Sequence, residues 1–365
     1  MDYQSIRRKS RQLKIGNTAI GAGHRIAIQS MTNTDPHDAA ATRAQILALQ
    51  EIGCDIVRVT VPDMEAAETI PHLKAPGVNI PIVADIHFDY RVALRCAELG
   101  IDKIRINPGN IGAEDRVQAV AKACKERGIP IRIGVNSGSL EKELLQKYGS
   151  PTPQALVESA MHHASLLEKF DFYDIAISIK SSDVSNMIAA NRLLAQRCDY
   201  PIHLGVTEAG NGDSGRIKSA IGIGSLLCDG IGDTLRVSLT DDPLTEIAAA
   251  QDIINALRIE GQSGMDIVSC PTCGRTKIDL VSLCEQFKAA AAKEGLLSMP
   301  VKVALMGCVV NGPGEAREAD VGIAGGRGEG LLIRRGEIVK KLPEEELIPA
   351  LIAMLCEIRE ERNRI

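Results

Sequence analysis

The sequence predicts an α/β fold, a TIM (β/α)8 barrel followed by a small α+β domain. Eight short runs rich in Val and Ile recur between residues 26 and 239, and stretches with helical spacing separate them. The pattern changes after residue 264, where turns and shorter runs replace it. A chain of 365 residues also exceeds the roughly 250 residues that one such barrel takes, so a second domain is expected.

The predicted strands are bounded by Gly, Pro or Asp and alternate with predicted helices. They span residues 26–31, 55–61, 80–88, 102–107, 129–136, 174–180, 201–207 and 233–239. Several of the helical stretches close on a glycine suited to a helix C-cap. Because strands that alternate with helices pair in parallel, and because there are eight, a closed barrel is favoured over an open doubly wound sheet.

The segment EGQSG at residues 260–264 breaks the helix after the eighth strand and predicts a domain boundary. We assign residues 1–262 to the barrel, as the substrate-binding domain, and residues 263–365 to the α+β domain. The second domain should contain a helix near 279–294, a strand in PVKVALMG, two short strands near 320–334 and a charged final helix.

The composition excludes several function classes. With 45% hydrophobic and 24% charged residues, the chain is typical of a soluble globular protein. A net charge of -5 and the absence of Trp argue against nucleic acid as a partner. The N-terminal residues lack the apolar segment of a secretory signal, and no run is long enough to cross a membrane. We therefore expect a cytoplasmic protein with no membrane partner.

Ten cysteines need an explanation, because a disulfide framework is improbable in the cytoplasm. Seven of them lie singly in apolar or helical stretches, where cysteine acts as a small hydrophobic residue; these are Cys54, Cys96, Cys124, Cys198, Cys228, Cys284 and Cys356. Cys270, Cys273 and Cys308 remain. The first two form a CxxC in a turn, which redox dithiols, zinc sites and iron-sulfur sites all use.

Cys308 opens a second turn-rich loop after a predicted strand, as a third ligand should. No His follows His203, so a zinc site of three cysteines and one histidine lacks a member. A carboxylate is the remaining candidate for a fourth ligand. Glu315 stands in the same loop as Cys308, although an average loop Glu is a solvent-exposed acid.

Cations recur at the carboxyl ends of the predicted strands, where TIM barrels carry their catalytic residues. Five strands contribute one each: Arg58, Arg105, Arg132, Lys180 and Arg236. Other polar residues share these ends: Asp85, His87, Asn107, Asn136, Thr207, Glu208 and Ser238. A single Arg is usually a salt-bridge or rim residue, and a lone His is usually a core residue. Five cations on five strands instead indicate a site for a diphosphate, whose oxygens guanidinium groups match in pairs.

The phrases CPTCGRT and CVVNGPGEA resemble the cluster-binding sequence of the 4-hydroxy-3-methylbut-2-enyl diphosphate synthases of the non-mevalonate isoprenoid route. The resemblance extends over nearly the whole chain, through QSMTNTD, VRVTVP, ADIHF, RINPGN, RIGVNSGSL, ISIKSSD, HLGVTEAG and GDTLRVSLT. It implies a 4Fe-4S cluster held by Cys270, Cys273, Cys308 and Glu315, which makes the second domain an iron-sulfur domain. It also implies that the barrel segments line a pocket for 2-C-methyl-D-erythritol 2,4-cyclodiphosphate.

The implied activity is an oxidoreductase reaction, a two-electron reductive ring opening and dehydration of the cyclodiphosphate. The expected substrate-binding residues are Arg58, Arg105, Asn107, Arg132, Asn136, Lys180, Thr207, Arg236 and Ser238. Glu208 is the expected proton donor, with His87 or Asp85 as its rival. The resemblance also implies flavodoxin or ferredoxin as electron donor, the two-domain bacterial form, and a head-to-tail homodimer.

Two other interpretations remain open from the residues. One is a TIM-barrel enzyme without redox chemistry, resembling pterin-binding methyl transferases, in which zinc stabilises the second domain. The other is a regulatory module that binds a diphosphate without turnover. Both predict a colourless protein, whereas an iron-sulfur protein is brown.

Overall fold

The computed structural model describes residues 3–259, 264–308, 314 and 316–363. The chain forms two compact units, Met1–Leu257 and Arg258–Ile365. Each unit has its own sheet and its own core, and each is described here by itself. None of the helices that the described residues form combines the length and the apolar character needed to span a membrane.

The first unit is a barrel of eight parallel strands, which confirms the predicted fold. The sheet has the order β8-β7-β6-β5-β4-β3-β10-β9, and a parallel bridge between Ile177 and Ile202 joins β8 to β9 and closes the ring. The strands are β3 (Ala27–Met31), β4 (Ile56–Thr60), β5 (Ile82–Asp85), β6 (Lys103–Ile106), β7 (Ile131–Asn136), β8 (Ile175–Lys180), β9 (His203–Leu204) and β10 (Thr234–Leu235).

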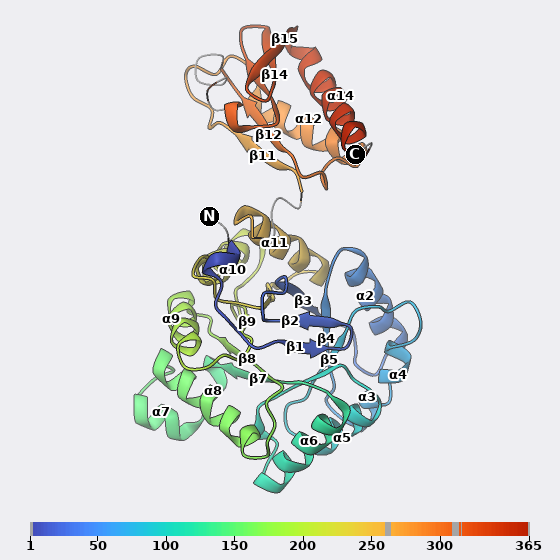
Figure 1. Cartoon of the computed structure of the whole chain (residues 1–365), viewed down its shortest axis with the longest axis vertical. Helices are drawn as coiled ribbons and strands as arrows, with labels where there is room; N and C mark the ends of the chain where they lie inside the picture. Colours follow the sequence, from blue (N-terminus) through green and yellow to red (C-terminus); the bar gives the residue numbers. More distant parts are fainter. Residues whose placement is uncertain (1–2, 260–263, 309–313, 315, 364–365) are drawn as a thin grey trace. The chain divides into compact units, whose positions relative to one another are not determined.

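Helices form an outer ring around the barrel (Figure 1). They are α2 (Ala39–Glu51), α3 (Met64–Ala67), α4 (Ile70–Leu73), α5 (Tyr90–Glu98), α6 (Glu114–Arg127), α7 (Lys142–Tyr148), α8 (Pro153–Glu168), α9 (Val184–Ala195), α10 (Gly212–Cys228) and α11 (Pro243–Ala256). Aspartate side chains cap five of these helices by accepting a backbone N–H of the first turn: Asp38, Asp63, Asp89, Asp183 and Asp242. Short segments complete the unit: α1 (Tyr3–Ile6), η1 (Pro108–Asn110) and η2 (Ser137–Ser139).

A hairpin before the first barrel strand closes the amino end of the barrel. Its strands β1 (Leu13–Ile15) and β2 (Thr18–Ile20) pair antiparallel, and Gly16 in the turn has a φ of 55° that favours glycine. Ile15 and Ile20 are buried in one apolar cluster with residues near the amino ends of the barrel strands: Ala27, Ile56, Val83 and Ala176. Figure 1 shows the hairpin lying across the ring of helices. Ligands therefore have access from the opposite, carboxyl end.

The second unit is a five-stranded sheet in the order β11-β12-β13-β14-β15. The first three strands pair in parallel and the last three antiparallel. The strands are β11 (Asp266–Ser269), β12 (Lys302–Met306), β13 (Val321–Gly325), β14 (Glu329–Arg334) and β15 (Glu337–Pro343), with the short η3 (Ala316–Glu318) beside them. Helices α12 (Leu280–Lys293) and α14 (Glu344–Asn363) supply the other half of its apolar core.

The prediction of a small α+β domain is thus confirmed, with two strands that the sequence did not indicate. β11 is a half-buried edge strand of four residues, too short for a clear alternation. β15 is the other edge, and almost all of its side chains are exposed. Lysines on an exposed edge strand protect it from pairing with other chains, but they remove the apolar signal by which a strand is predicted.

Candidate active site

The register of the barrel places the predicted site residues on its inner face. Asp85 of β5 pairs with Arg105 of β6, and Arg105 pairs with Arg132 of β7. Partners in neighbouring parallel strands point to the same face of a sheet, and residues two apart along one strand share that face. Asn136 lies four residues beyond Arg132 on β7 and so shares its face. Lys180 of β8 is the register partner of Asn136 and lies on the same face. The polar side chains therefore converge at the carboxyl end of the barrel.

A cavity of about 280 Å³ opens at this end. Its lining residues are Met31, Arg58, Asp85, His87, Arg105, Asn136, Ser178, Lys180, Thr207, Arg236 and Ser238. All of these except Met31 and Ser178 are residues that the sequence indicated. The structure therefore brings four of the five predicted cations to one cavity.

Asp85 holds two of these cations together. Its Oδ1 accepts from Arg105 Nη1 at 3.1 Å, and its Oδ2 lies 3.6 Å from Arg58 Nε. Burial of the Asp85 carboxyl would raise its pKa, but the charges of Arg58 and Arg105 outweigh burial and leave that pKa below its usual value. Asp85 is therefore a carboxylate at neutral pH. Within the described residues no hydrogen bond joins it to His87, which is exposed.

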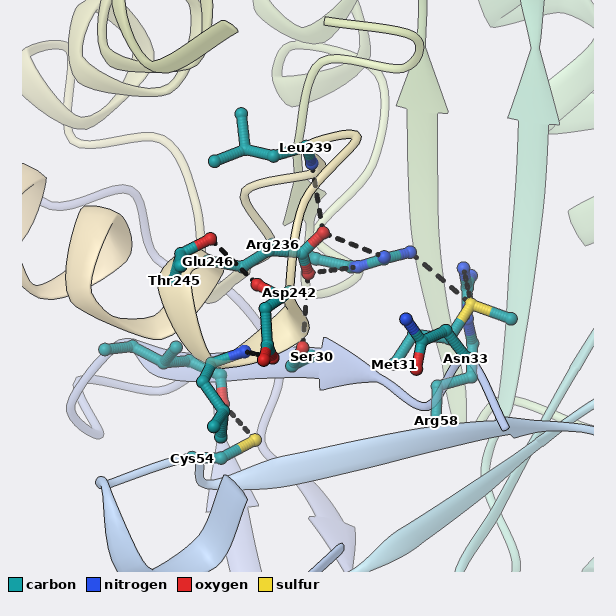
Figure 2. A network of polar contacts seen from close by, with 12 residues as sticks. Ser30, Met31, Asn33, Cys54, Arg58, Arg236, Leu239, Asp242, Thr245 and Glu246 are labelled. Carbon is teal, nitrogen blue, oxygen red and sulfur yellow. Dashed lines mark hydrogen bonds and ion pairs between the residues drawn. The ribbon is translucent and has the colours of Figure 1, made fainter. Parts of the chain in front are cut away.

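Glu246 holds a third cation, Arg236, in place (Figure 2). Its two carboxylate oxygens lie 3.2 Å from Nε and Nη2 of Arg236, so the pair is bidentate. The same carboxylate accepts from Ser30 Oγ at 3.2 Å and from the backbone N–H of Leu239 at 3.0 Å. Glu246 is buried, with only 2% of its surface exposed, and its carboxylate oxygens accept hydrogen bonds from protein groups around the cavity.

Met31 lies between the guanidinium groups of Arg58 and Arg236 (Figure 2). Its thioether sulfur accepts from Arg58 Nη2 at 2.8 Å and from Arg236 Nη1 at 3.4 Å. A thioether is a weak acceptor without charge. It therefore adds no negative charge to that of Asp85 and Glu246, and an anion that enters the cavity can displace it from both guanidinium groups.

Two glycines make room for the cations. A Cβ on Gly134 would lie 2.4 Å from Arg105 Nε, and one on Gly205 would lie 2.7 Å from Lys180 Nζ. Contacts this short are excluded for real side chains, so the long side chains occupy space that only glycine leaves free.

Lys180 has no counter-charge of its own. Among residues 3–259 no ion pair or hydrogen bond reaches its ammonium group, and only 7% of the residue is exposed. Burial, followed by the charges of Arg236, Arg58 and Arg132, lowers the pKa of Lys180 well below its ordinary value.

A second polar layer lies deeper in the barrel. Arg132 and Lys103 are completely buried, and their side-chain nitrogens have no partner within the described residues. The Nε2 of His203 and both polar atoms of the Gln29 amide likewise lack one. Burial and the charge of Arg132 lower the pKa of His203 well below its ordinary value, while its Nδ1 lies 2.7 Å from Thr234 Oγ1.

Three predicted residues lie outside the cavity lining. Arg132 belongs to the deeper layer, and Asn107 Oδ1 accepts from the backbone N–H of Gly134 at 2.9 Å, which positions the loop after β6. Glu208 is exposed and has a φ of 53°, a left-handed conformation that is costly for a residue other than glycine. Such strain is often found at functional sites.

The three predicted cysteine ligands, Cys270, Cys273 and Cys308, lie in two loops at one end of the sheet in the second unit. Cys270 follows β11 and Cys308 follows β12, which are parallel neighbours. The Gly307 backbone N–H donates to Cys270 Sγ at 3.2 Å. A Cβ on Gly307 would lie 2.8 Å from Thr276, whose Oγ1 accepts from the Cys273 N–H at 3.1 Å. The two cysteine loops therefore pack directly against each other.

The electrostatics of this end suit thiolates. Hydrogen bonds from the backbone and side chain of Arg275 lower the pKa of the exposed Cys273 thiol. By contrast, burial raises the pKa of Cys54 to about 11, as expected for a cysteine that fills the barrel core. Of the seven cysteines expected in apolar surroundings, Cys228 differs, because it is exposed.

Glu315 lies outside the described residues, so its place relative to the cysteines is not part of the structure. The described residues alone hold no group of three or more His, Cys, Asp or Glu side chains that could bind a single metal ion. A four-iron cluster presents its irons at separate corners and so takes more widely spaced ligands than one ion does. The three cysteine thiols lie on two adjoining loops, and a backbone amide donates to one of the sulfurs. This arrangement fits a four-iron cluster.

Sequence reasoning missed Met31, Ser178 and Glu246. Ser178 precedes Lys180 by two residues on the same strand, so the strand period indicates it. Met31 resembles an ordinary core residue at the end of β3. Glu246 follows the cap residue Asp242 in the first turn of α11, where an acid is common in any helix, and no sequence signal separates it from that role.

Models of one protein family match both parts of the chain, and relatives match nearly its whole length. A family model described as the GcpE TIM-barrel domain matches residues 10–251, and one described as the GcpE protein C-terminal domain matches residues 266–357. The 4-hydroxy-3-methylbut-2-en-1-yl diphosphate synthase (flavodoxin) of Clostridium perfringens is 57% identical over 349 residues, 96% of this chain and 99% of that relative. The protein of the same name from Geobacter sulfurreducens is 55% identical over 98% of this chain and 100% of its own.

A solved structure shares the barrel fold. The type I 3-dehydroquinate dehydratase of Clostridium difficile covers 69% of this chain and 99% of its own, with a TM-score of 0.52 and 12% identity. At that identity the likeness shows the fold and carries no statement about the reaction.

We predict that Glu246→Gln loosens Arg236. An amide cannot hold the guanidinium through two charged oxygens, and one buried charge remains unpaired. We expect a loss of roughly 3 kcal/mol in the free energy of unfolding, measured by urea denaturation. Glu143→Gln, an exposed acid in the first turn of α7, is the matched control and should change stability by less than about 0.5 kcal/mol. Equal effects of the two changes would contradict the anchoring role.

We also predict that His203 makes the barrel sensitive to acid. Its pKa in the folded chain is lowered, so below an unfolded pKa of about 6.5 only the unfolded chain takes up this proton. Stability should therefore fall as the pH drops from 6.5, by at most about 1.4 kcal/mol per pH unit from this group. In urea denaturation between pH 7.5 and 5, His203→Asn should show a smaller slope than the unmodified chain. His162→Asn, at an exposed position, should keep the original slope.

Proposed function

The chain belongs to the GcpE family, which its domain matches and its relatives at 57% and 55% identity show, and from that membership we propose its reaction. It is an oxidoreductase, a 4-hydroxy-3-methylbut-2-en-1-yl diphosphate synthase of the non-mevalonate isoprenoid route. It converts 2-C-methyl-D-erythritol 2,4-cyclodiphosphate to 4-hydroxy-3-methylbut-2-enyl diphosphate by two-electron reductive ring opening and dehydration.

The observation that carries this proposal is the excess of positive charge in the barrel cavity. Four cations line it, while the carboxylates near it, Asp85 and Glu246, are already engaged with guanidinium groups. A neutral substrate would leave this charge uncompensated. A diphosphate supplies several anionic oxygens and suits forked guanidinium donors.

We assign substrate contacts by position. Cations at the cavity wall bind the diphosphate, namely Arg58, Arg105, Lys180 and Arg236. Uncharged polar groups of the same wall bind the hydroxyl groups of the carbon skeleton, namely Asn136, Thr207 and Ser238. Arg132 adds charge from the layer below, and Asn107 keeps the loop after β6 in place. Neutralising the diphosphate also lowers the electrostatic cost of adding electrons to the substrate.

A departing hydroxyl group needs a proton. Glu208 is our proposed donor, because it lies in the loop after the seventh barrel strand, in a strained conformation, and is exposed. His87 is the alternative, since it lines the cavity itself. Asp85 is the least suited of the three, because Arg58 and Arg105 favour its deprotonated form.

We propose a 4Fe-4S cluster with Cys270, Cys273, Cys308 and Glu315 as ligands. When bound, such a cluster supplies electrons singly and acts as a Lewis acid. The chain's own part is to stabilise the thiolates: the Gly307 N–H does so for Cys270, and Arg275 does so for Cys273.

The relatives' names include flavodoxin, so we propose a flavodoxin as electron donor, with ferredoxin as the alternative. We further propose a homodimer, with residues 1–262 as the substrate-binding domain and residues 263–365 as the cluster domain.

The test is anaerobic purification followed by metal analysis and turnover. We expect a brown protein with about four irons per chain that turns over the cyclodiphosphate when a low-potential reductant is supplied. Cys270→Ala should lose iron but still bind the cyclodiphosphate, whereas Arg236→Met should keep iron and bind it more weakly. Cys356→Ala, a half-buried cysteine outside the proposed ligand set, is the matched control and should keep both properties. A colourless protein that holds only zinc, or an iron protein without turnover, would contradict the proposal.

A further inference from the structure

We propose that the Lys180 amine is a nucleophile, and that the barrel cavity takes small phosphorylated aldehydes and ketones as imines on its Nζ atom. This reactivity goes beyond the proposed reductive reaction. It uses only the barrel and does not depend on a cluster.

Lys180 is placed for such a reaction. It is the last residue of β8 and lines the cavity together with Ser178, two residues earlier on the same strand. Gly205 faces the amine so closely that any Cβ there would lie 2.7 Å from Nζ. The amine therefore has the protein backbone on one side and the cavity on the other.

While no anion occupies the cavity, the surroundings of Lys180 favour an uncharged amine, whereas a bound diphosphate favours its charged form. The groups that face it are the cations Arg236, Arg58 and Arg132, the buried His203, and the carboxylate of Glu246, which is already bound to Arg236. Burial and the three guanidinium groups lower the pKa of Lys180 well below its ordinary value. A lysine that is desolvated next to other cations is the established pattern of an imine-forming amine.

The cavity defines the class of ligand. Arg58 and Arg236 are paired with Asp85 and Glu246, but each also directs a guanidinium nitrogen at the weak acceptor Met31, and a phosphate group can take over these donors. A volume of about 280 Å³ limits the carbon skeleton to a few atoms. A ligand with both a phosphate and a carbonyl group can then occupy the arginines and reach the amine together.

Lys103 is a second buried amine, but it lacks the access to the cavity that Lys180 has. Its pKa is also lowered by burial, and its Nζ has no partner within the described residues. However, it lies in the deeper layer and is not part of the cavity lining. A dissolved aldehyde should therefore modify Lys180 and leave Lys103 unmodified.

The step is an addition followed by loss of water. The amine nitrogen of Lys180 forms a bond to the carbonyl carbon and loses one proton, the carbonyl oxygen takes up a proton, and a carbinolamine results. The C–O bond then breaks, the oxygen takes up a second proton and leaves as water, and the nitrogen loses its second proton as the C=N bond forms. No electrons are exchanged. His87, which is exposed and lines the cavity, is the side chain placed to relay these protons.

One consequence concerns the proposed substrate. The imine occupies Lys180, and the phosphate of the ligand occupies the arginines assigned to the diphosphate. Phosphorylated carbonyl compounds should therefore compete with the cyclodiphosphate, reversibly until a reductant traps the imine.

The experiment traps the imine on the full chain. Glyceraldehyde 3-phosphate is added at neutral pH with cyanoborohydride, which reduces the imine to a stable secondary amine, and the modified peptide is identified by mass spectrometry. We expect one main adduct, on Lys180. Glyceraldehyde without phosphate should label this position at least about tenfold less, because it lacks the arginine contacts. Inorganic diphosphate should protect Lys180 from labelling.

Variants and protection complete the test. Lys180→Arg removes the primary amine but keeps a basic side chain, and it should abolish the adduct, whereas Lys218→Arg, at an exposed position on α10, should leave it unchanged. If Lys180→Arg does not fold, the unmodified chain supplies the test. Loss of its Lys180 adduct when inorganic diphosphate is present then supports the proposal. Labelling spread evenly over exposed lysines, or labelling of Lys180 that neither the phosphate on the aldehyde nor inorganic diphosphate affects, would overturn the proposal.

Discussion

Two buried carboxylates allow several guanidinium groups to share one small cavity. Asp85 binds Arg58 and Arg105, and Glu246 binds Arg236 through two oxygens. Without these acids, mutual repulsion and the cost of desolvation would drive the cations apart or toward solvent. With them, the cations keep fixed positions while the cavity as a whole stays positive. The account of substrate binding depends on this partial compensation, because full neutralisation would leave no attraction for a diphosphate.

The barrel supplies what this arrangement needs. The β1–β2 hairpin and its apolar cluster close the amino end, so the charged groups lie in a pocket at the carboxyl end of the barrel. Glycines 134 and 205 leave space for long side chains on adjoining strands. Met31 contacts two guanidinium groups without adding a negative charge. The same surroundings that attract a diphosphate also deprive Lys180 of a counter-ion, and its nucleophilic character follows from that. Substrate binding and amine reactivity therefore have one physical origin.

Much of the barrel site is predictable, because two simple rules apply to it. Strand ends carry function in this fold, and alternate residues share a face, so Arg58, Lys180 and their neighbours could be selected. Glu246 could not, because an acid in the first turn of a helix has an ordinary explanation and its contact to Arg236 is tertiary. Nor could the burial of Arg132, since sequence gives no depth within a barrel. In the second unit, the charged edge strand β15 lacks an apolar pattern. The ligand role of Glu315 rests on its motif and stays a prediction.

The most direct test of the central claim is a calorimetric titration of the cyclodiphosphate into the full chain and into Arg58→Met. Arg192→Met, an exposed arginine paired with Asp229 on the outside of the barrel, is the control. If the uncompensated charge of the cavity binds the diphosphate, loss of Arg58 should weaken binding by roughly 30- to 100-fold, the equivalent of about 2 to 3 kcal/mol. Loss of Arg192 should leave the dissociation constant unchanged. Equal affinities of all three chains would contradict the account.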